Sequence, residues 1–163
     1  MKVLLAVLIG FSIFTFGNAN AELKTTVPSE VCNYLTESGL ITGSWKNRYD
    51  NEYGCLSPYK ELTGSPVANN IAFYADGDNN SVKKIKLVLN INDNASATNA
   101  HKELLQVSAN LIAKITGGKL PTDLKKAIEK GQNFSTKIGA VSVDIVREDW
   151  LSGNGYEIRV SIQ

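Results

Sequence analysis

Alternating apolar and polar residues predict two β-hairpins in this chain. The first consists of residues 70–75 and 82–92, which are joined by a run of Asp, Gly and Asn typical of a turn. The second consists of residues 134–147 and 156–162, with a turn-forming Ser-Gly-Asn-Gly run between them. Each strand has an apolar side and a polar side, so we expect each to be buried on one face only.

The segment between the two hairpins has the spacing of amphipathic helices. Apolar residues recur at three, four and seven positions from 97 to 115, and Gly117-Gly118 ends this pattern. A shorter helix is expected from Pro121 to Gly131. Because the apolar stripes of these helices need a surface to cover, we predict an α+β fold. Its mainly antiparallel sheet has about four strands, and the helix pair packs on one face.

The segment before the first hairpin is less regular. A short N-terminal helix is expected near Pro28, with Ser29 as its cap and Gly39 beyond its end. Residues 42–66 hold no period and are rich in Gly, Asn and Pro, which predicts a long loop. Such loops in compact domains usually need a constraint or a function.

The first 21 residues have the three-part pattern of a cleaved secretory signal. Lys2 is followed by an apolar run over residues 3–16 and by the small residues of Ala19-Asn20-Ala21. We therefore predict a signal peptide over residues 1–21 and a single exported α+β domain over residues 22–163. The simple signal favours a periplasmic or secreted protein of a bacterium. The alternative is an uncleaved N-terminal anchor.

Charge and cysteine content further narrow the class of protein that this chain can be. The chain has 17 basic and 16 acidic residues, and removal of the signal removes one lysine, so no global field would attract nucleic acid. No later apolar run is long enough for a permanent membrane span. Export favours a disulfide between Cys32 and Cys55, which would brace the loop. With His101 as the only histidine, ligands for a structural metal are too few.

No motif in the sequence predicts catalysis, and we expect no enzymatic activity, no cofactor and no metal. Residues 76–81 resemble the front of a calcium loop, but Ser81 replaces its glycine and Leu87 its bidentate glutamate. His101 is expected at the surface or boundary of its helix, because no oriented nucleophile accompanies it. An acid-pair hydrolase remains an alternative, and the acids that could supply the pair are Asp50, Glu52, Asp144, Glu148 and Asp149.

Binding of another protein is the better hypothesis. Aromatic and arginine side chains are typical of interface hot spots, and the candidate partner-binding residues are Trp45, Arg48, Tyr49, Tyr53 and Trp150. The polar side of the sheet, which is to meet solvent or a partner, carries Lys84, Lys86, Asn90, Asn92, Glu157 and Arg159. The alternative is that the rings only cover the edge of a small core.

We therefore expect an exported non-enzymatic protein-binding module, with the periplasm as its favoured location, whose partner is another exported or envelope protein. Inhibitors, immunity-type proteins and envelope accessory proteins fit this profile. A small-ligand-binding protein is a further alternative, although the apolar strand faces look fully needed for packing.

Overall fold

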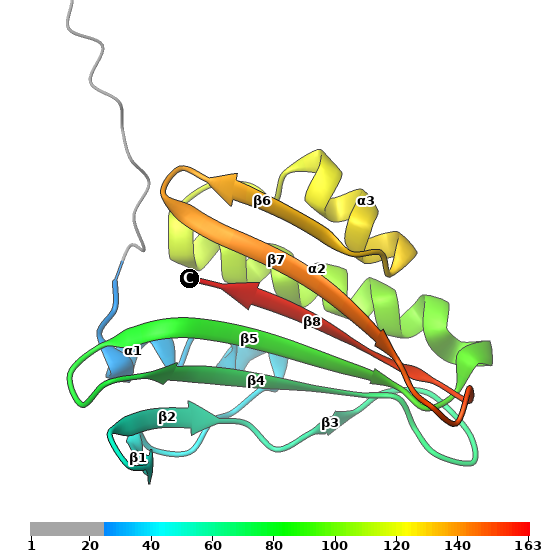
Figure 1. Cartoon of the computed structure of the whole chain (residues 1–163), viewed down its shortest axis with the longest axis horizontal. Helices are drawn as coiled ribbons and strands as arrows, with labels where there is room; N and C mark the ends of the chain where they lie inside the picture. Colours follow the sequence, from blue (N-terminus) through cyan, green and yellow to red (C-terminus); the bar gives the residue numbers. More distant parts are fainter. Residues whose placement is uncertain (1–24) are drawn as a thin grey trace, which may run out of the picture.

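The computed structural model describes residues 25–163, so the predicted signal peptide lies outside the described residues. In the described part, eight strands form one sheet with helices on one of its faces (Figure 1). The strands are β1 (Lys46–Tyr49), β2 (Glu52–Leu56), β3 (Lys60–Glu61), β4 (Asn70–Gly77), β5 (Val82–Ile91), β6 (Phe134–Ile138), β7 (Val141–Asp149) and β8 (Tyr156–Ile162). The helices are α1 (Pro28–Val31), α2 (Ala97–Thr116) and α3 (Thr122–Lys130), with single 3₁₀ turns η1 (Thr36–Ser38) and η2 (Asn94–Ser96).

The sheet is antiparallel throughout, in the order β1-β2-β4-β5-β8-β7-β6. The short strand β3 pairs with β4 beyond the end of β2, so that β2 and β3 share one side of β4. The two predicted hairpins, β4–β5 and β7–β8, meet where β5 pairs with β8 over residues 85–91. These four strands form the centre of the sheet.

The predicted α+β class and the helix pair are confirmed, but the expectation of about four strands is wrong. The additional strands are β1, β2, β3 and β6. Residues 42–66, expected to be a loop, contain three of them. All four residues of β1 are exposed, so this strand has no apolar alternation that a sequence pattern could reveal. Residues 134–147 are two strands, because Gly139 adopts φ +64° and turns the chain between β6 and β7.

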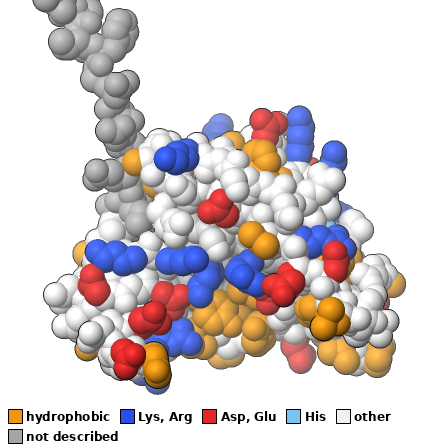
Figure 2. All heavy atoms as spheres, in the orientation of Figure 1, with side chains coloured by type: hydrophobic (Ala, Val, Ile, Leu, Met, Phe, Trp, Pro, Cys, Tyr) orange, Lys and Arg blue, Asp and Glu red, His pale blue; other side chains and the backbone are white. Residues whose placement is uncertain are grey.

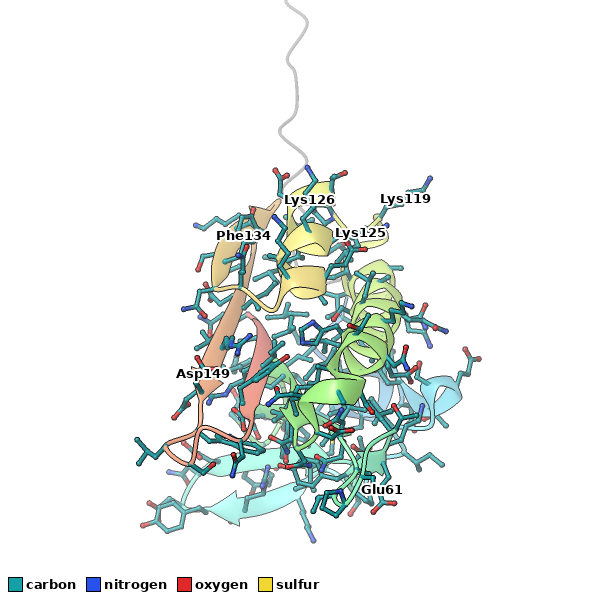
Figure 3. The ribbon with its side chains drawn as sticks, turned by 90° about the vertical axis from the view of Figure 1, so that its right-hand side faces the viewer. Glu61, Lys119, Lys125, Lys126, Phe134 and Asp149 are labelled. Carbon is teal, nitrogen blue, oxygen red and sulfur yellow. A yellow bond between two sulfur atoms is a disulfide. The ribbon has the colours of Figure 1, made fainter. Side chains whose placement is uncertain are left out.

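The core lies between the sheet and the helices, which form two layers when the molecule is viewed from the side (Figure 3). Helix α2 contributes Leu104, Leu111, Ile112 and Ile115, which are buried with the apolar faces of β4, β5, β7 and β8. Both long helices end at left-handed glycines, Gly117 and Gly131, as their spacing predicts. None of the helices between residues 25 and 163 has the length and hydropathy to cross a membrane.

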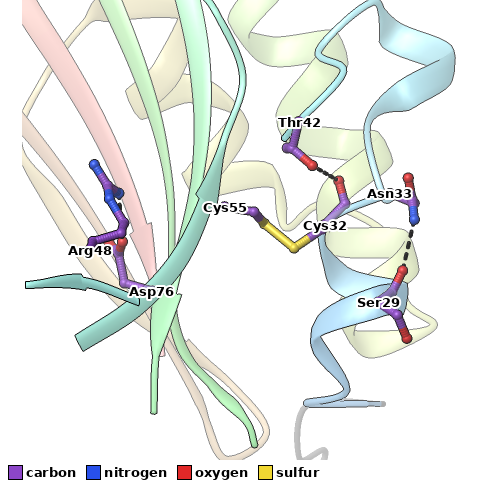
Figure 4. Close-up of a disulfide and its surroundings, with 7 residues drawn as sticks. All are labelled: Ser29, Cys32, Asn33, Thr42, Arg48, Cys55 and Asp76. Atoms are coloured by element: carbon purple, nitrogen blue, oxygen red, sulfur yellow. Dashed lines mark hydrogen bonds and ion pairs between the residues drawn. A yellow bond between two sulfur atoms is a disulfide. The ribbon is translucent and has the colours of Figure 1, made fainter. Parts of the chain in front are cut away.

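The predicted disulfide between Cys32 and Cys55 is confirmed (Figure 4). It joins the residue after α1 to strand β2, with the two Cα atoms 6.1 Å apart, and both cysteines are buried. The Thr42 hydroxyl donates a hydrogen bond of 2.9 Å to the carbonyl oxygen of Cys32. The N-terminal segment is thereby fixed to the outer part of the sheet.

Candidate binding surface

The helices leave one face of the sheet uncovered, which we call the open face (Figures 1 and 2). Strand alternation places the polar side chains of the central strands on it. Lys86 lies between Tyr74 of β4 and Ser161 of β8, and Asn90 lies between Asn70 and Glu157. The polar side that the sequence predicts is therefore this face, apart from Asn92, which lies beyond β5 and donates a hydrogen bond to the Ala68 carbonyl oxygen.

Four apolar or aromatic residues gather on the open face, and we call them the open-face cluster: Tyr59, Tyr74, Val88 and Val146. Tyr59 is 50% exposed and Val146 is 43% exposed, whereas Val88 is nearly buried. The hydroxyls of Tyr59 and Tyr74 are hydrogen-bonded at 3.2 Å. Burial of Tyr74, together with this hydrogen bond, raises the pKa of its phenol far above the ordinary value. The hydroxyl contact holds the two rings side by side, and they form an aromatic surface.

Two adjoining hollows mark the open face. The first, of about 760 Å³, is lined by Arg48, Tyr49, Glu52, Tyr53, Asp76, Gly77, Asp78, Lys83, Lys84 and Lys86. The second, of about 610 Å³, is lined by the open-face cluster and by Lys84, Lys86, Ser135, Asp144, Glu157, Arg159, Ser161 and Gln163. Because Lys84 and Lys86 line both hollows, the two form one continuous surface that crosses the sheet.

A row of Lys and Arg side chains crosses the open face (Figure 2). Asp76 pairs with Arg48 at 3.2 Å and with Lys86 at 2.8 Å. Arg159 pairs with Glu157 at 2.7 Å and with Glu148 at 3.1 Å, and these carboxylates raise the pKa of Arg159. The acids therefore hold most of the cationic groups in place and leave only part of their charge free.

Gly54 of β2 permits the contact between Arg48 and Asp76. A Cβ atom at this position would lie 2.8 Å from the Ala75 carbonyl oxygen and 3.0 Å from both Arg48 Cδ and Asp76 Oδ1. Without a side chain at Gly54, the arginine of β1 crosses β2 to reach the carboxylate on β4 (Figure 4). A glycine in a strand often marks such a close approach.

The structure separates the five predicted partner-binding residues. Arg48, Tyr49 and Tyr53 belong to the β1–β2 hairpin and line the first hollow, where Tyr49 is 72% exposed. Trp45 instead packs partly against the core beside α1 and the disulfide, and its indole N–H is buried with no hydrogen-bond partner among the described residues. Trp150 stacks over Gly155 in the β7–β8 connection and lines neither hollow.

Sequence reasoning missed the open-face cluster as a site. The signal is present in the strand pattern, because Val88 and Val146 are apolar residues on the otherwise polar sides of β5 and β7. Neither residue is required by the core, which lies on the opposite face. An apolar residue on the polar side of a central strand therefore indicates a candidate contact surface.

His101, expected at the surface or boundary of its helix, is buried, so a surface position is wrong. Its Nδ1 lies 3.1 Å from the Glu129 carbonyl oxygen and its Nε2 lies 3.0 Å from the Tyr156 hydroxyl. Because a carbonyl oxygen only accepts, Nδ1 carries the proton, and in the neutral ring Tyr156 donates to Nε2. Arg147 stacks on the Tyr156 ring, with its guanidinium carbon 3.6 Å from the ring centroid. The histidine therefore links α2, α3 and β8.

Three other candidates for chemistry are the calcium-like turn at Asp78, a metal site and a pair of acids. Asp78 accepts hydrogen bonds from the backbone N–H groups of Asn80 and Ser81, as in an ordinary turn. Between residues 25 and 163, no group of three His, Cys, Asp or Glu residues is placed to hold a metal. The candidate acids Asp50 and Glu52 lie at the β1–β2 connection, far across the sheet from the others on β7.

The chain belongs to a family of unknown function, DUF6030, whose model matches residues 22–150. Neither the curated proteins nor the solved structures contain a significant match to it.

Proposed function

We propose that this protein is an exported, non-enzymatic module that binds another exported or envelope protein through the open face of its sheet. The observation that carries the proposal is the composition of that face. An apolar and aromatic centre, the open-face cluster, is bordered by charged side chains that are themselves held by ion pairs. Protein interfaces have this arrangement, with an apolar centre rich in tyrosine and a polar rim.

Export is supported by the signal-like segment, by the start of the family match directly after it, and by the disulfide. The signal-like segment ends at residue 21, and the family match begins at residue 22. The disulfide between Cys32 and Cys55 is of the kind that forms and persists in oxidising compartments. These features support a location in the periplasm or outside the cell, where an inhibitor, an immunity-type protein or an envelope accessory would meet its partner.

Rigidity favours binding by the open face. The side chains of the cluster stand on β4, β5 and β7, which the sheet holds in fixed register, and on the segment after β2. Tyr59 is further held by its hydroxyl contact with Tyr74. Because these groups are ordered before binding, less conformational entropy is lost when a partner covers them.

The test is site-specific photocrosslinking in the producing cells, with the signal retained. A benzophenone amino acid is placed at Val146 or at Tyr59 on the open face, and at Lys125 on α3 as the matched exposed control (Figure 3). We expect the same protein to be crosslinked from both open-face positions and not from the control. Crosslinks from Lys125 alone, or none from either open-face position, would refute the proposal.

A further inference from the structure

We infer that two copies of this chain associate through strand β6, which pairs in antiparallel orientation with β6 of the second copy and joins the two sheets into one. The structure also gives the register, in which Ser135 of each copy lies opposite Lys137 of the other. The inference is independent of the proposed function, because a single copy already has a complete open face.

The ordered strands end in β1 at one side of the sheet and in β6 at the other (Figure 1). Strand β1 has the cations Lys46 and Arg48 among its four exposed residues, and its pairing with β2 is irregular after Asn47. Charged side chains and bulges of this kind discourage the addition of a further strand. Strand β6 has one charged residue, Lys137, and pairs with β7 without a shift of register. It is therefore the less protected edge.

The hydrogen bonds of β7 show which backbone groups of β6 face outward. Ser142 of β7 exchanges backbone hydrogen bonds of 2.7 and 3.0 Å with Gln163, on the β8 side. Its N–H and C=O groups therefore point away from Lys137, the residue opposite it on β6. By antiparallel alternation, Lys137 and Ser135 direct their own N–H and C=O groups to the outer side of β6. Among residues 25–163, these four groups have no hydrogen-bond partner.

One twofold register satisfies all of these groups within the strand. With Ser135 opposite Lys137 of the second copy, the pair exchanges two hydrogen bonds, and the symmetry-related pair exchanges two more. Registers that place Ser135 opposite itself, or Lys137 opposite itself, leave the other residue opposite one that lies outside β6. The second of these also brings like charges directly opposite each other, which is destabilising.

The side of β6 that faces the core favours the same register. It brings Phe134 opposite Ile138 of the second copy, and Thr136 opposite Thr136. All three residues are half-buried in a single copy, where Phe134 and Ile138 pack partly against the core. Cross-strand pairs of an aromatic with an aliphatic residue, and of two threonines, stabilise antiparallel sheets. Pairing would thus cover an apolar margin that is partly exposed.

Charge complementarity on the open face supports this register independently. Asp144 of β7 lies opposite Ser135, so the row across the two copies is Asp144, Ser135 and then Lys137 of the second copy. Because neighbouring strands are about 4.8 Å apart, the long lysine side chain can cross the small serine to reach the carboxylate. Among residues 25–163, neither Asp144 nor Lys137 forms an ion pair.

The opposite edge of the sheet already contains an ion pair of this kind. Arg48 of β1 crosses Gly54 of β2 and pairs with Asp76 of β4 at 3.2 Å. In both cases an edge cation passes a small residue on the next strand to meet an acid on the third. The proposed contact therefore repeats an arrangement that the fold accommodates.

Sedimentation velocity of the mature protein tests the association. We expect a dimer whose fraction rises between about 1 and about 300 µM, because an interface of one short strand is small and weak. Ser135→Pro removes an outward N–H and leaves the bonds to β7 intact, so it should raise the dimer dissociation constant at least about tenfold. The matched control Ser135→Ala keeps that N–H and should stay within about twofold. Circular dichroism establishes that both variants are folded.

Charge reversal tests the ion pair between copies. Lys137→Glu and Asp144→Lys should each weaken self-association at least about tenfold, because each places like charges together twice in the dimer. An equimolar mixture of the two variants should restore it, since the new carboxylate of one then meets the new ammonium group of the other. An ion pair within one chain cannot produce this rescue. Lys46→Glu on β1 is the control and should leave the association within about twofold.

Single cysteines test the register. Thr136 lies opposite itself in a pair whose Cα atoms would be about 4.5 Å apart, within the range of a disulfide. Mild oxidation should therefore give a covalent dimer of Thr136→Cys and not of Ser135→Cys or Lys137→Cys. A protein that stays monomeric up to about 300 µM, a dimer unaffected by Ser135→Pro, or no rescue in the mixture would overturn the inference. Crosslinking from Ser135→Cys or Lys137→Cys in place of Thr136→Cys would also overturn it.

Discussion

Removal of the disulfide should destabilise the protein by an amount that its position in the chain determines. Cys32 and Cys55 are 23 residues apart in sequence, and in the loop-entropy model closure of a loop of this size stabilises the folded state by about 3.4 kcal/mol. The double variant Cys32→Ala, Cys55→Ala tests this directly. It should remain folded, because the central strands β4, β5, β7 and β8 keep their pairing without the bond.

Urea denaturation of the variant and the wild type gives the magnitude. With a denaturant slope of roughly 2 kcal/mol per molar urea, the midpoint should fall by about 1.7 M. Addition of a reducing agent should bring the wild-type midpoint close to that of the variant and leave the variant unchanged. A midpoint shift below about 0.5 M, which corresponds to about 1 kcal/mol, would refute the loop-closure reasoning.

Three further changes test the packing of the fold, each by the urea midpoint. Gly155→Ala should destabilise the protein by more than about 2 kcal/mol, because the new Cβ would lie 2.1 Å from a β5 carbonyl oxygen. The control Gly43→Ala, whose Cβ would have nothing within 4 Å, should change the stability by less than about 0.5 kcal/mol. Similar losses of stability in the two variants would contradict this account of the packing. Tyr156→Phe should cost about 1–2 kcal/mol, since it leaves the buried Nε2 of His101 without its donor, and a neutral result would show that this hydrogen bond does not matter. Hydrogen bonds to Asp93 from a serine hydroxyl and a backbone N–H lower the pKa of its carboxyl below 3.8, so its stabilisation is present above that pH and is lost as the pH falls through the lower, folded-state pKa. Asp93→Asn should therefore reduce the loss of stability that occurs as the pH falls below about 4, and an unchanged pH profile would contradict this assignment.

The central part of the fold follows from the sequence because it has strong periodicity. The alternation in residues 82–92 and 156–162 corresponds to β5 and β8, and the helical spacing from 97 to 115 corresponds to α2. Each of these elements buries one side against the same core, so local pattern and tertiary packing agree. The cysteine pair was predictable from the signal-like segment and the even number of cysteines.

The outer strands could not be read from the sequence, because their formation depends on pairing and not on burial. Strand β1 has four exposed residues, and β3 has only two residues, which pair with one end of β4. Neither has an apolar side that periodicity could detect. The separation of Trp45 from Tyr49 follows from the same cause, because the path of the hairpin decides which side chain meets the core.

The open face could be predicted from the sequence only in part, for a related reason. The polar sides of the strands predict that it is solvent-facing, but not that Tyr59, Tyr74, Val88 and Val146 come together on it. These residues lie on four separate segments, and only the strand order β4-β5-β8-β7 sets their spacing. A surface assembled from segments far apart in sequence requires the register of the sheet.

The most direct test of the central claim is the affinity of the crosslinked partner, once it is purified, for variants of the two faces. Isothermal titration calorimetry would compare Val146→Glu on the open face with Lys125→Glu on the helix layer, both of which change exposed residues. The account predicts that the first substitution weakens binding by at least about tenfold, because it places a charge in the apolar centre, and that the second changes it by less than about twofold. Equal affinities of Val146→Glu and the wild type, or a larger loss in Lys125→Glu, would contradict binding through the open face.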